Sequence, residues 1–177
     1  MFRNSICAIL LVASAAVAQD GSDPDSLWTQ ATLYRDEWGS PHIFADNYRS
    51  MAFAFGYAHA EDHLETMLMA YRVANGRAAE VWGRRAAASD EFAIRMNHAG
   101  LARRAYLDAD AATRDLCEGF ALGVNTWLLE NIDRAPPWAE GVGPSDILAF
   151  LHYYLMSMAP LDIPGMGQER VPRAKAN

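Results

Sequence analysis

The chain has 177 residues, of which 51% are hydrophobic and 21% charged, so its composition is that of a folded protein rather than a disordered one. This length suits a single domain with a core of its own. The formal net charge is −7 and no cluster of Lys and Arg stands out, so a nucleic acid is not an expected partner.

The first eighteen residues have the pattern of a signal peptide. A positive residue, Arg3, precedes an apolar run over residues 6–17, and the small residues Ala16 and Ala18 frame a cleavage site. A buried N-terminal strand or helix is the alternative. With residues 1–18 taken as a signal peptide, the protein is expected to be periplasmic or secreted, with no membrane span after cleavage.

A lead-in and a strand pair follow the signal peptide. Residues 19–30 include the polar stretch GSDPDS, which predicts a flexible lead-in. The stretches Thr29–Arg35 and Pro41–Ala45 contain β-branched and aromatic residues, and Gly39-Ser40-Pro41 interrupts them. We therefore expect a hairpin-like pair of short strands.

A long helix is the strongest signal in the chain. Apolar residues recur at steps of four and three, as on a helix that faces a core. The residues of this stripe are Phe53, Tyr57, Ala60, Leu64, Met67, Tyr71 and Ala74. Asn75-Gly76 is expected to end or bend the helix, and one or two further turns stop at Gly83.

Two more apolar helices are expected in the second half. The first covers Ala111–Ile132, with Asp110 as its N-cap, and Leu116, Phe120, Val124, Trp127 and Leu128 repeat on it at helical spacing. The second begins at a capping Ser145 and ends at Pro160. Residues 84–100 suggest a loop with a short helix. The main helical region is thus 31–160, and 161–177 is expected to be a linker or the start of a spacer.

His59 and His63 raise the possibility of a zinc site. Residues four apart share one face of a helix, and zinc proteases use such histidine pairs. Ala60 breaks the HExxH order, and the inverted order requires Asp62 in place of glutamate. A third ligand would come from Glu80, Glu91 or Glu118. The alternative is a polar helix face on which two histidines happen to lie.

Several short segments, in one order and spacing, resemble the start of the penicillin acylase family of N-terminal-nucleophile hydrolases. This family includes penicillin amidases, acyl-homoserine-lactone acylases and aculeacin-type lipopeptide acylases. The resembling segments are RDEWG (35–39), PHI (41–43), GYA (56–58), AED (60–62), Gly76, AEV (79–81) and Gly83. GFALGVNTWL (119–128) and PSDILAF (144–150) resemble the family's next two helices.

The resemblance implies a fold and a division of labour. The fold is mainly α with a short strand pair, the α-subunit part of an αββα N-terminal-nucleophile hydrolase. In the family, a precursor cleaves itself before a serine that becomes the nucleophile of a β-subunit. The chain is then identified as a signal peptide plus α segment, or as a truncated precursor, without a catalytic residue of its own. Its partners are the β-subunit and an acyl amide of β-lactam, homoserine-lactone or lipopeptide type.

The resemblance also implies site residues. The AHAED segment is scaffold rather than zinc site, with Asp62 in a buried polar contact. The family's last α-subunit helix lines an acyl pocket, which here places Tyr154, Met156 and Met158 as substrate-binding candidates, with core packing as the alternative for each. The two methionines cannot both face the pocket, and Met156 is favoured.

The resemblance also implies which cofactors the protein needs, and the residues fit an alternative function as well. Catalysis in the family needs no cofactor, but some members hold a structural calcium ion, for which Glu169 is the candidate ligand here. A different class of protein also fits the residues, namely a noncatalytic exported helical module that binds an apolar ligand or partner.

Overall fold

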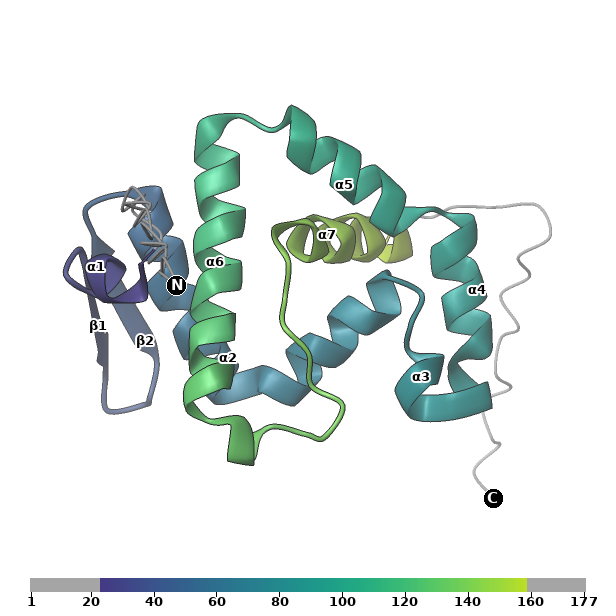
Figure 1. The fold of residues 1–177 in the computed structure, drawn as a ribbon, viewed down its shortest axis with the longest axis horizontal. Coiled ribbons are helices and arrows are strands. Elements are labelled where there is room, and N and C mark those ends of the chain that lie inside the picture. Colours follow the sequence, from purple (N-terminus) through teal and green to yellow (C-terminus); the bar gives the residue numbers. More distant parts are fainter. Residues whose placement is uncertain (1–22, 159–177) are drawn as a thin grey trace, which may run out of the picture.

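The computed structural model describes residues 23–158, which form a mainly helical fold with one two-stranded antiparallel sheet, as expected (Figure 1). The expectations for the signal peptide at 1–18, for Pro160 and Glu169, and for the linker at 161–177 lie outside the described residues. No helix within residues 23–158 is both long and apolar enough to cross a membrane.

The end of the expected flexible lead-in is instead a short helix, α1 (Pro24–Trp28). The Asp23 side chain caps it by accepting from the Asp25 amide at 3.3 Å. Leu27 is only 1% exposed, and the Trp28 ring lies edge-on to Phe53 with centroids 4.9 Å apart. The buried Leu27 and the half-buried Trp28 anchor a segment whose composition suggested a flexible chain.

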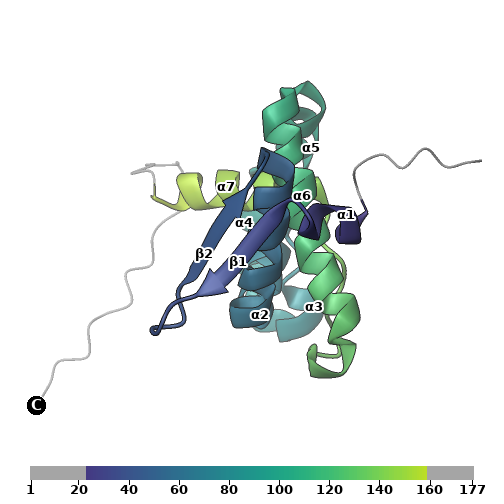
Figure 2. The same cartoon turned by 90° about the vertical axis from the view of Figure 1, so that its left-hand side faces the viewer.

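The strand pair is confirmed as β1 (Ala31–Arg35) and β2 (Pro41–Ala45), which are antiparallel with Leu33 opposite Ile43. The Asp36 carboxylate closes the turn by accepting from the amides of Trp38 and Ser40, each at 2.9 Å. Figure 2 shows this hairpin in front of helix α2, against which both strands pack.

Helix α2 (Tyr48–Ala74) confirms the long helix, and the Asn47 side chain caps its start by accepting from the Ser50 amide at 2.9 Å. The residues of the predicted stripe are buried, apart from a half-buried Tyr57. The backbone leaves helical geometry at His63, with φ −141° and ψ 25°, which the sequence pattern did not predict. Gly76, with φ 68°, follows the end of the helix.

Helix α6 (Ala111–Glu130) packs directly on α2, and the predicted Asp110 cap is confirmed by a 2.7 Å bond from the Thr113 amide. The two backbones touch at glycines: a Cβ atom on Gly123 would lie 2.0 Å from the Phe53 carbonyl oxygen. Leu116 departs from the predicted stripe, since it is 38% exposed. The main core lies between these helices and contains Ala60, Leu64, Met67, Leu68, Tyr71, Ala121, Val124, Trp127, Leu128 and Val142.

The weak region after Gly83 is more helical than expected. The turns α3 (Ala79–Trp82) and η1 (Gly83–Ala86) lead into α4 (Ala87–Arg95) and α5 (His98–Asp108). Helix α5 was not predicted from the sequence, and its buried residues are His98 and Ala102. A helix that buries so few side chains has little apolar periodicity to detect.

Helix α7 (Pro144–Met158) follows the short turn η2 (Ile132–Arg134) and a loop, and α5 lies alongside it (Figure 1). The expected Ser145 cap is wrong, because the helix begins one residue earlier at Pro144, a residue that suits the first helical position. The Asp146 carboxylate accepts from the Gly143 amide at 2.8 Å and closes this end of the helix.

Candidate functional site

One face of α7 is anchored and the opposite face is uncovered. Ala149 is 1% exposed, and the Phe150 ring lies edge-on to Tyr71 on α2 with centroids 5.9 Å apart. Of the predicted pocket residues, Tyr154 is 48% exposed, Met158 is 66% exposed and Met156 is half-buried. Tyr154 and Met158 therefore lie on the exposed face of α7, whereas the favoured Met156 is less accessible.

An apolar groove of about 240 Å³ runs between α5 and the same helix. Leucines and alanines form most of its wall, and the imidazole of His152 forms the rest. Its lining residues are Leu101, Ala102, Ala105, Leu148, Leu151, His152 and Leu155. Leu151 and Leu155 belong both to this groove and to the exposed face of α7, which makes the region suited to an apolar partner or ligand.

The rings of the two histidines of the zinc hypothesis do lie close together, edge-on with centroids 5.5 Å apart, but His59 packs among aromatic rings and His63 is exposed. The Phe55 ring lies 5.7 Å from that of His59. Burial, and then the nearby His63, lower the pKa of His59. No cluster of three or more His, Cys, Asp or Glu residues that could hold a metal occurs between residues 23 and 158.

The three glutamates considered as further zinc ligands have other partners. Each carboxylate forms an ion pair with arginine: Glu80 with Arg72 and Arg77, Glu91 with Arg95, and Glu118 with Arg49. Asp62 binds Arg35 at 2.9 Å and is 36% exposed, so the expected buried contact is wrong. The carboxylate instead ties helix α2 to the hairpin at the surface, because Arg35 ends strand β1.

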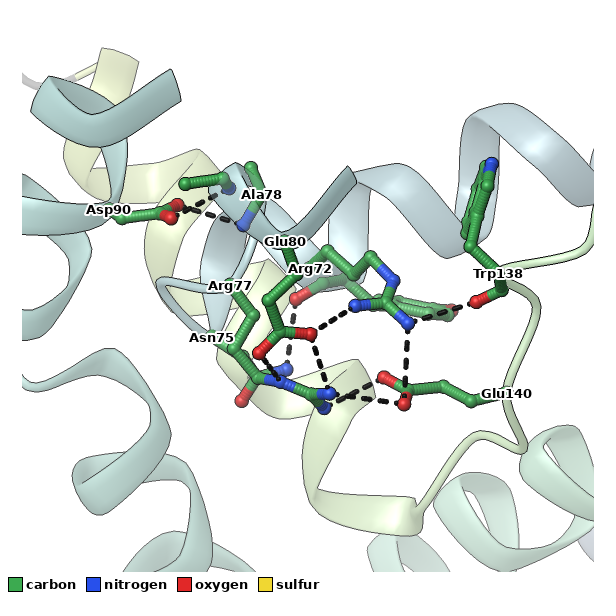
Figure 3. A network of polar contacts seen from close by, with 10 residues as sticks. Arg72, Asn75, Arg77, Ala78, Glu80, Asp90, Trp138 and Glu140 are labelled. Atoms are coloured by element: carbon green, nitrogen blue, oxygen red, sulfur yellow. Dashed lines mark hydrogen bonds and ion pairs between the residues drawn. The ribbon is translucent and has the colours of Figure 1, made fainter. Parts of the chain in front are cut away.

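A polar pocket of about 400 Å³ lies where the end of α2 meets α5 and the loop before α7. Arg72 is buried there, and its Nη1 binds Glu80 at 2.6 Å while its Nη2 donates to the Trp138 carbonyl oxygen at 2.9 Å (Figure 3). Arg77 binds both Glu80 and Glu140, the latter at 2.7 Å. These contacts tie the loop to helix α2.

The protonation behaviour of this network follows from its pairing. The hydrogen bonds that Arg77 donates to Glu80, and then to Glu140, raise the pKa of Arg77. The hydrogen bond from Arg77 holds the pKa of Glu80 below its usual range. The pairing therefore favours the charged forms of Arg77 and Glu80, as a structural clamp requires.

Asp90 makes a separate capping contact beside the network. Its two carboxylate oxygens accept from the Ala78 amide at 2.9 Å and the Ala79 amide at 2.8 Å, which fixes the start of α3 against α4 (Figure 3). Neither Asp90 nor the arginine network was predicted from the sequence. Arg72 lies beside an apolar stripe on its helix, and a charged side chain in such a place is buried only when it is paired. This position was the signal in the sequence that could have indicated the network.

The sequence model of the penicillin amidase family matches residues 30–175. The chain belongs to this family. Among solved structures, a thermostable penicillin G acylase from Alcaligenes faecalis is similar with a TM-score of 0.60 and 25% identity, over 73% of this chain and 72% of that one. The expected fold, the α part of an N-terminal-nucleophile hydrolase, is confirmed.

Two kinds of relative in the penicillin amidase family resemble this chain. A penicillin acylase 2 proenzyme from a Pseudomonas species is 37% identical over 96 residues, which cover 54% of this chain and 12% of that protein. An acyl-homoserine lactone acylase of Pseudomonas fluorescens is 29% identical over 137 residues, covering 70% of this chain and 18% of that protein. The chain therefore spans less than a fifth of the length of these relatives.

Proposed function

We propose that this chain is the α-subunit portion of an exported acylase, which hydrolyses the amide bond between an acyl chain and an amine-bearing nucleus. A β-subunit from the same precursor supplies the N-terminal serine nucleophile, so the chain alone is inactive. The family membership and the uncovered apolar face of α7 support this proposal. That face suits a helix whose covering layer is another polypeptide.

The acyl pocket forms where this α7 face meets the β-subunit. Leu151 and Leu155 are 50% and 57% exposed and are available to pack against the partner. Tyr154 and Met158 are exposed beside them, whereas Met156 is half-buried. Since a residue must be accessible before a partner can build a pocket around it, these exposures favour Met158 over Met156 as the pocket methionine.

The test compares two forms of the protein. The 177-residue chain is expressed alone and together with a β segment of the family, and each is assayed against penicillin, acyl-homoserine lactone and lipopeptide amides. We expect hydrolysis only from the combined form, since the nucleophile comes from the β segment. Turnover by the chain alone, or none by a correctly processed pair, would contradict the proposal. The substrate hydrolysed fastest identifies the amine nucleus.

A noncatalytic helical module is the second candidate, and the apolar groove between α5 and α7 favours it. Such a module would bind an apolar ligand without any β segment. Saturable binding of an acyl amide by the chain alone, with no gain of hydrolysis when a β segment is added, would support it instead.

The expected calcium ion belongs to the same proposal, with Glu169 as one of its ligands. Elemental analysis of the purified α/β enzyme is expected to find calcium, and E169Q is expected to lower its content. Equal calcium in both enzymes would remove Glu169 from the site.

A further inference from the structure

Two histidines meet at the junction of α5 and α7. The Nδ1 atoms of His98 and His152 lie 2.7 Å apart. His98 is completely buried, and its Nε2 atom has no hydrogen-bond partner among the described residues. His152 is half-buried. Two neutral rings can make this contact, because one Nδ1 atom carries a hydrogen and donates while the other accepts.

The contact accommodates one added proton but not two. A single proton turns the neutral bond into a stronger imidazolium–imidazole bond. A second proton places a hydrogen on both Nδ1 atoms, so the bond is lost and two positive charges face each other. Burial, and then His152, lower the pKa of His98. His98 is also the first residue of α5, where the helix dipole disfavours a positive charge.

The side chains around His98 do not offset a positive charge on its ring. The Phe92 ring of α4 and the Tyr153 ring of α7 flank His98, with centroids 5.8 and 5.6 Å away. Apart from burial, His152 is the ionisable neighbour among the described residues that shifts the pKa of His98. Charged residues on the packed elements have other contacts: Glu91 with Arg95, Arg72 with Glu80, Asp146 with Asn75 and Gly143, Glu118 with Arg49, and Arg103 lining the polar pocket.

The pair is one of two buried contacts that α5 makes with α7; in the other, Ala102 packs with Ala149. His152 and Ala102 also line the apolar groove between the two helices. Separation of the histidines therefore loosens the wall of this groove.

We propose that His98 and His152 form a proton-operated latch, which opens in mildly acidic solution and frees α5 from α7, widening the apolar groove between them. The direction follows from proton linkage. A free histidine has a pKa of about 6.5, and the closed latch lowers that of His98. The latch thus contributes its full stability above about pH 6.5 and loses it as the pH falls.

Hydrogen–deuterium exchange on the full chain tests this latch. Protection factors of the α5 amides, corrected for the intrinsic exchange rate at each pH, are compared between about pH 7.5 and 5. One linked proton is expected to lower them by up to about ten-fold per pH unit below about pH 6. The α6 amides, measured in the same molecules, are expected to keep their protection, which separates local opening from global unfolding.

Two variants isolate the charge. In H152N the amide oxygen and nitrogen are bonded to Cγ as Nδ1 is, so the side chain can still bond to His98 without taking up a proton of its own. We expect the pH response of α5 to weaken, because one of the two causes that lower the pKa of His98 is removed. In H63N an imidazole outside the latch is removed, and the response should match the wild type. An equal response in wild type and H152N would overturn the proposal.

A measurement on the unmodified chain keeps the proposal testable if H152N does not fold. An NMR titration should show the imidazoles of His98 and His152 taking up their protons in two steps, separated by more than one pH unit. Independent titration of both near pH 6.5 would contradict the latch. So would α5 protection that depends on added Zn²⁺ and disappears with a chelator, because the pair would then be bridged by a metal.

Discussion

Two helix pairs in this molecule are held together in opposite ways. Helices α2 and α6 meet backbone to backbone: Cβ atoms on Gly119 and Gly123 would lie 2.3 and 2.0 Å from carbonyl oxygens of α2. Helices α5 and α7 meet through small buried alanines and one histidine pair, and they leave leucines exposed. The contact between α2 and α6 is closely packed, whereas α5 and α7 leave an apolar surface exposed.

This difference indicates where the molecule tolerates change. Atoms in the α2–α6 contact have no free volume around them, so a single added methyl group forces the helices apart. The α7 face has solvent around it, so changes there should affect binding of a partner more than folding. Four predictions test this contrast.

The largest effect is expected from Gly123→Ala. Its new methyl group would overlap the Phe53 carbonyl oxygen, and we expect a loss of about 3 kcal/mol of unfolding free energy, although alanine is the better helix former. Chemical denaturation measures this change. Gly143→Ala is the control: its methyl group would meet the Asp146 carboxylate at an ordinary 3.4 Å, so we expect a loss below about 1 kcal/mol. Equal losses would disprove the close backbone contact.

Asp90→Ala tests the contact by which helix α4 holds the start of α3, in the segment that connects α2 to α5. Removing the carboxylate leaves the amides of Ala78 and Ala79 without their acceptor, which is expected to cost about 2 kcal/mol. Its neighbour Glu91 is exposed and serves as the control, with an expected change within about 0.5 kcal/mol for Glu91→Ala. Thermal unfolding of both variants decides whether the cap matters.

Met158→Ala and Met156→Ala test the proposed acyl pocket in the combined α/β enzyme. The variant that enlarges the pocket should shift relative kcat/KM toward longer or bulkier acyl groups by about ten-fold. The exposures predict this shift for Met158→Ala and a smaller one for Met156→Ala. An acyl-length series measures both. Unchanged profiles in the two variants would exclude α7 from the pocket.

The smallest effect on folding is expected from Leu155→Ala. This side chain is 57% exposed, so its truncation should change the unfolding free energy of the chain by less than about 0.5 kcal/mol. Leu128→Ala, in the core between α2 and α6 at 6% exposure, should cost about 2–5 kcal/mol. Similar losses would mean that α7 is already covered in the isolated chain.

The sequence alone determined the elements whose signals are local. The strand pair, helix α2, the Asp110 cap of α6 and the family membership follow from periodicity, capping residues and short segments in order. A buried stripe on α2 must recur along its own sequence, so neighbouring residues carry enough information to predict it.

The tertiary structure decided the contacts between residues that lie far apart in the sequence. His98 and His152 are 54 positions apart, and Arg72 and Trp138 are 66 apart, so no local pattern links them. Helix α5 buries His98 in such a contact, and α1 buries Leu27 against the rest of the chain. Ala149 and Leu155 lie on one apolar helix, yet only packing decides that the first is buried and the second uncovered.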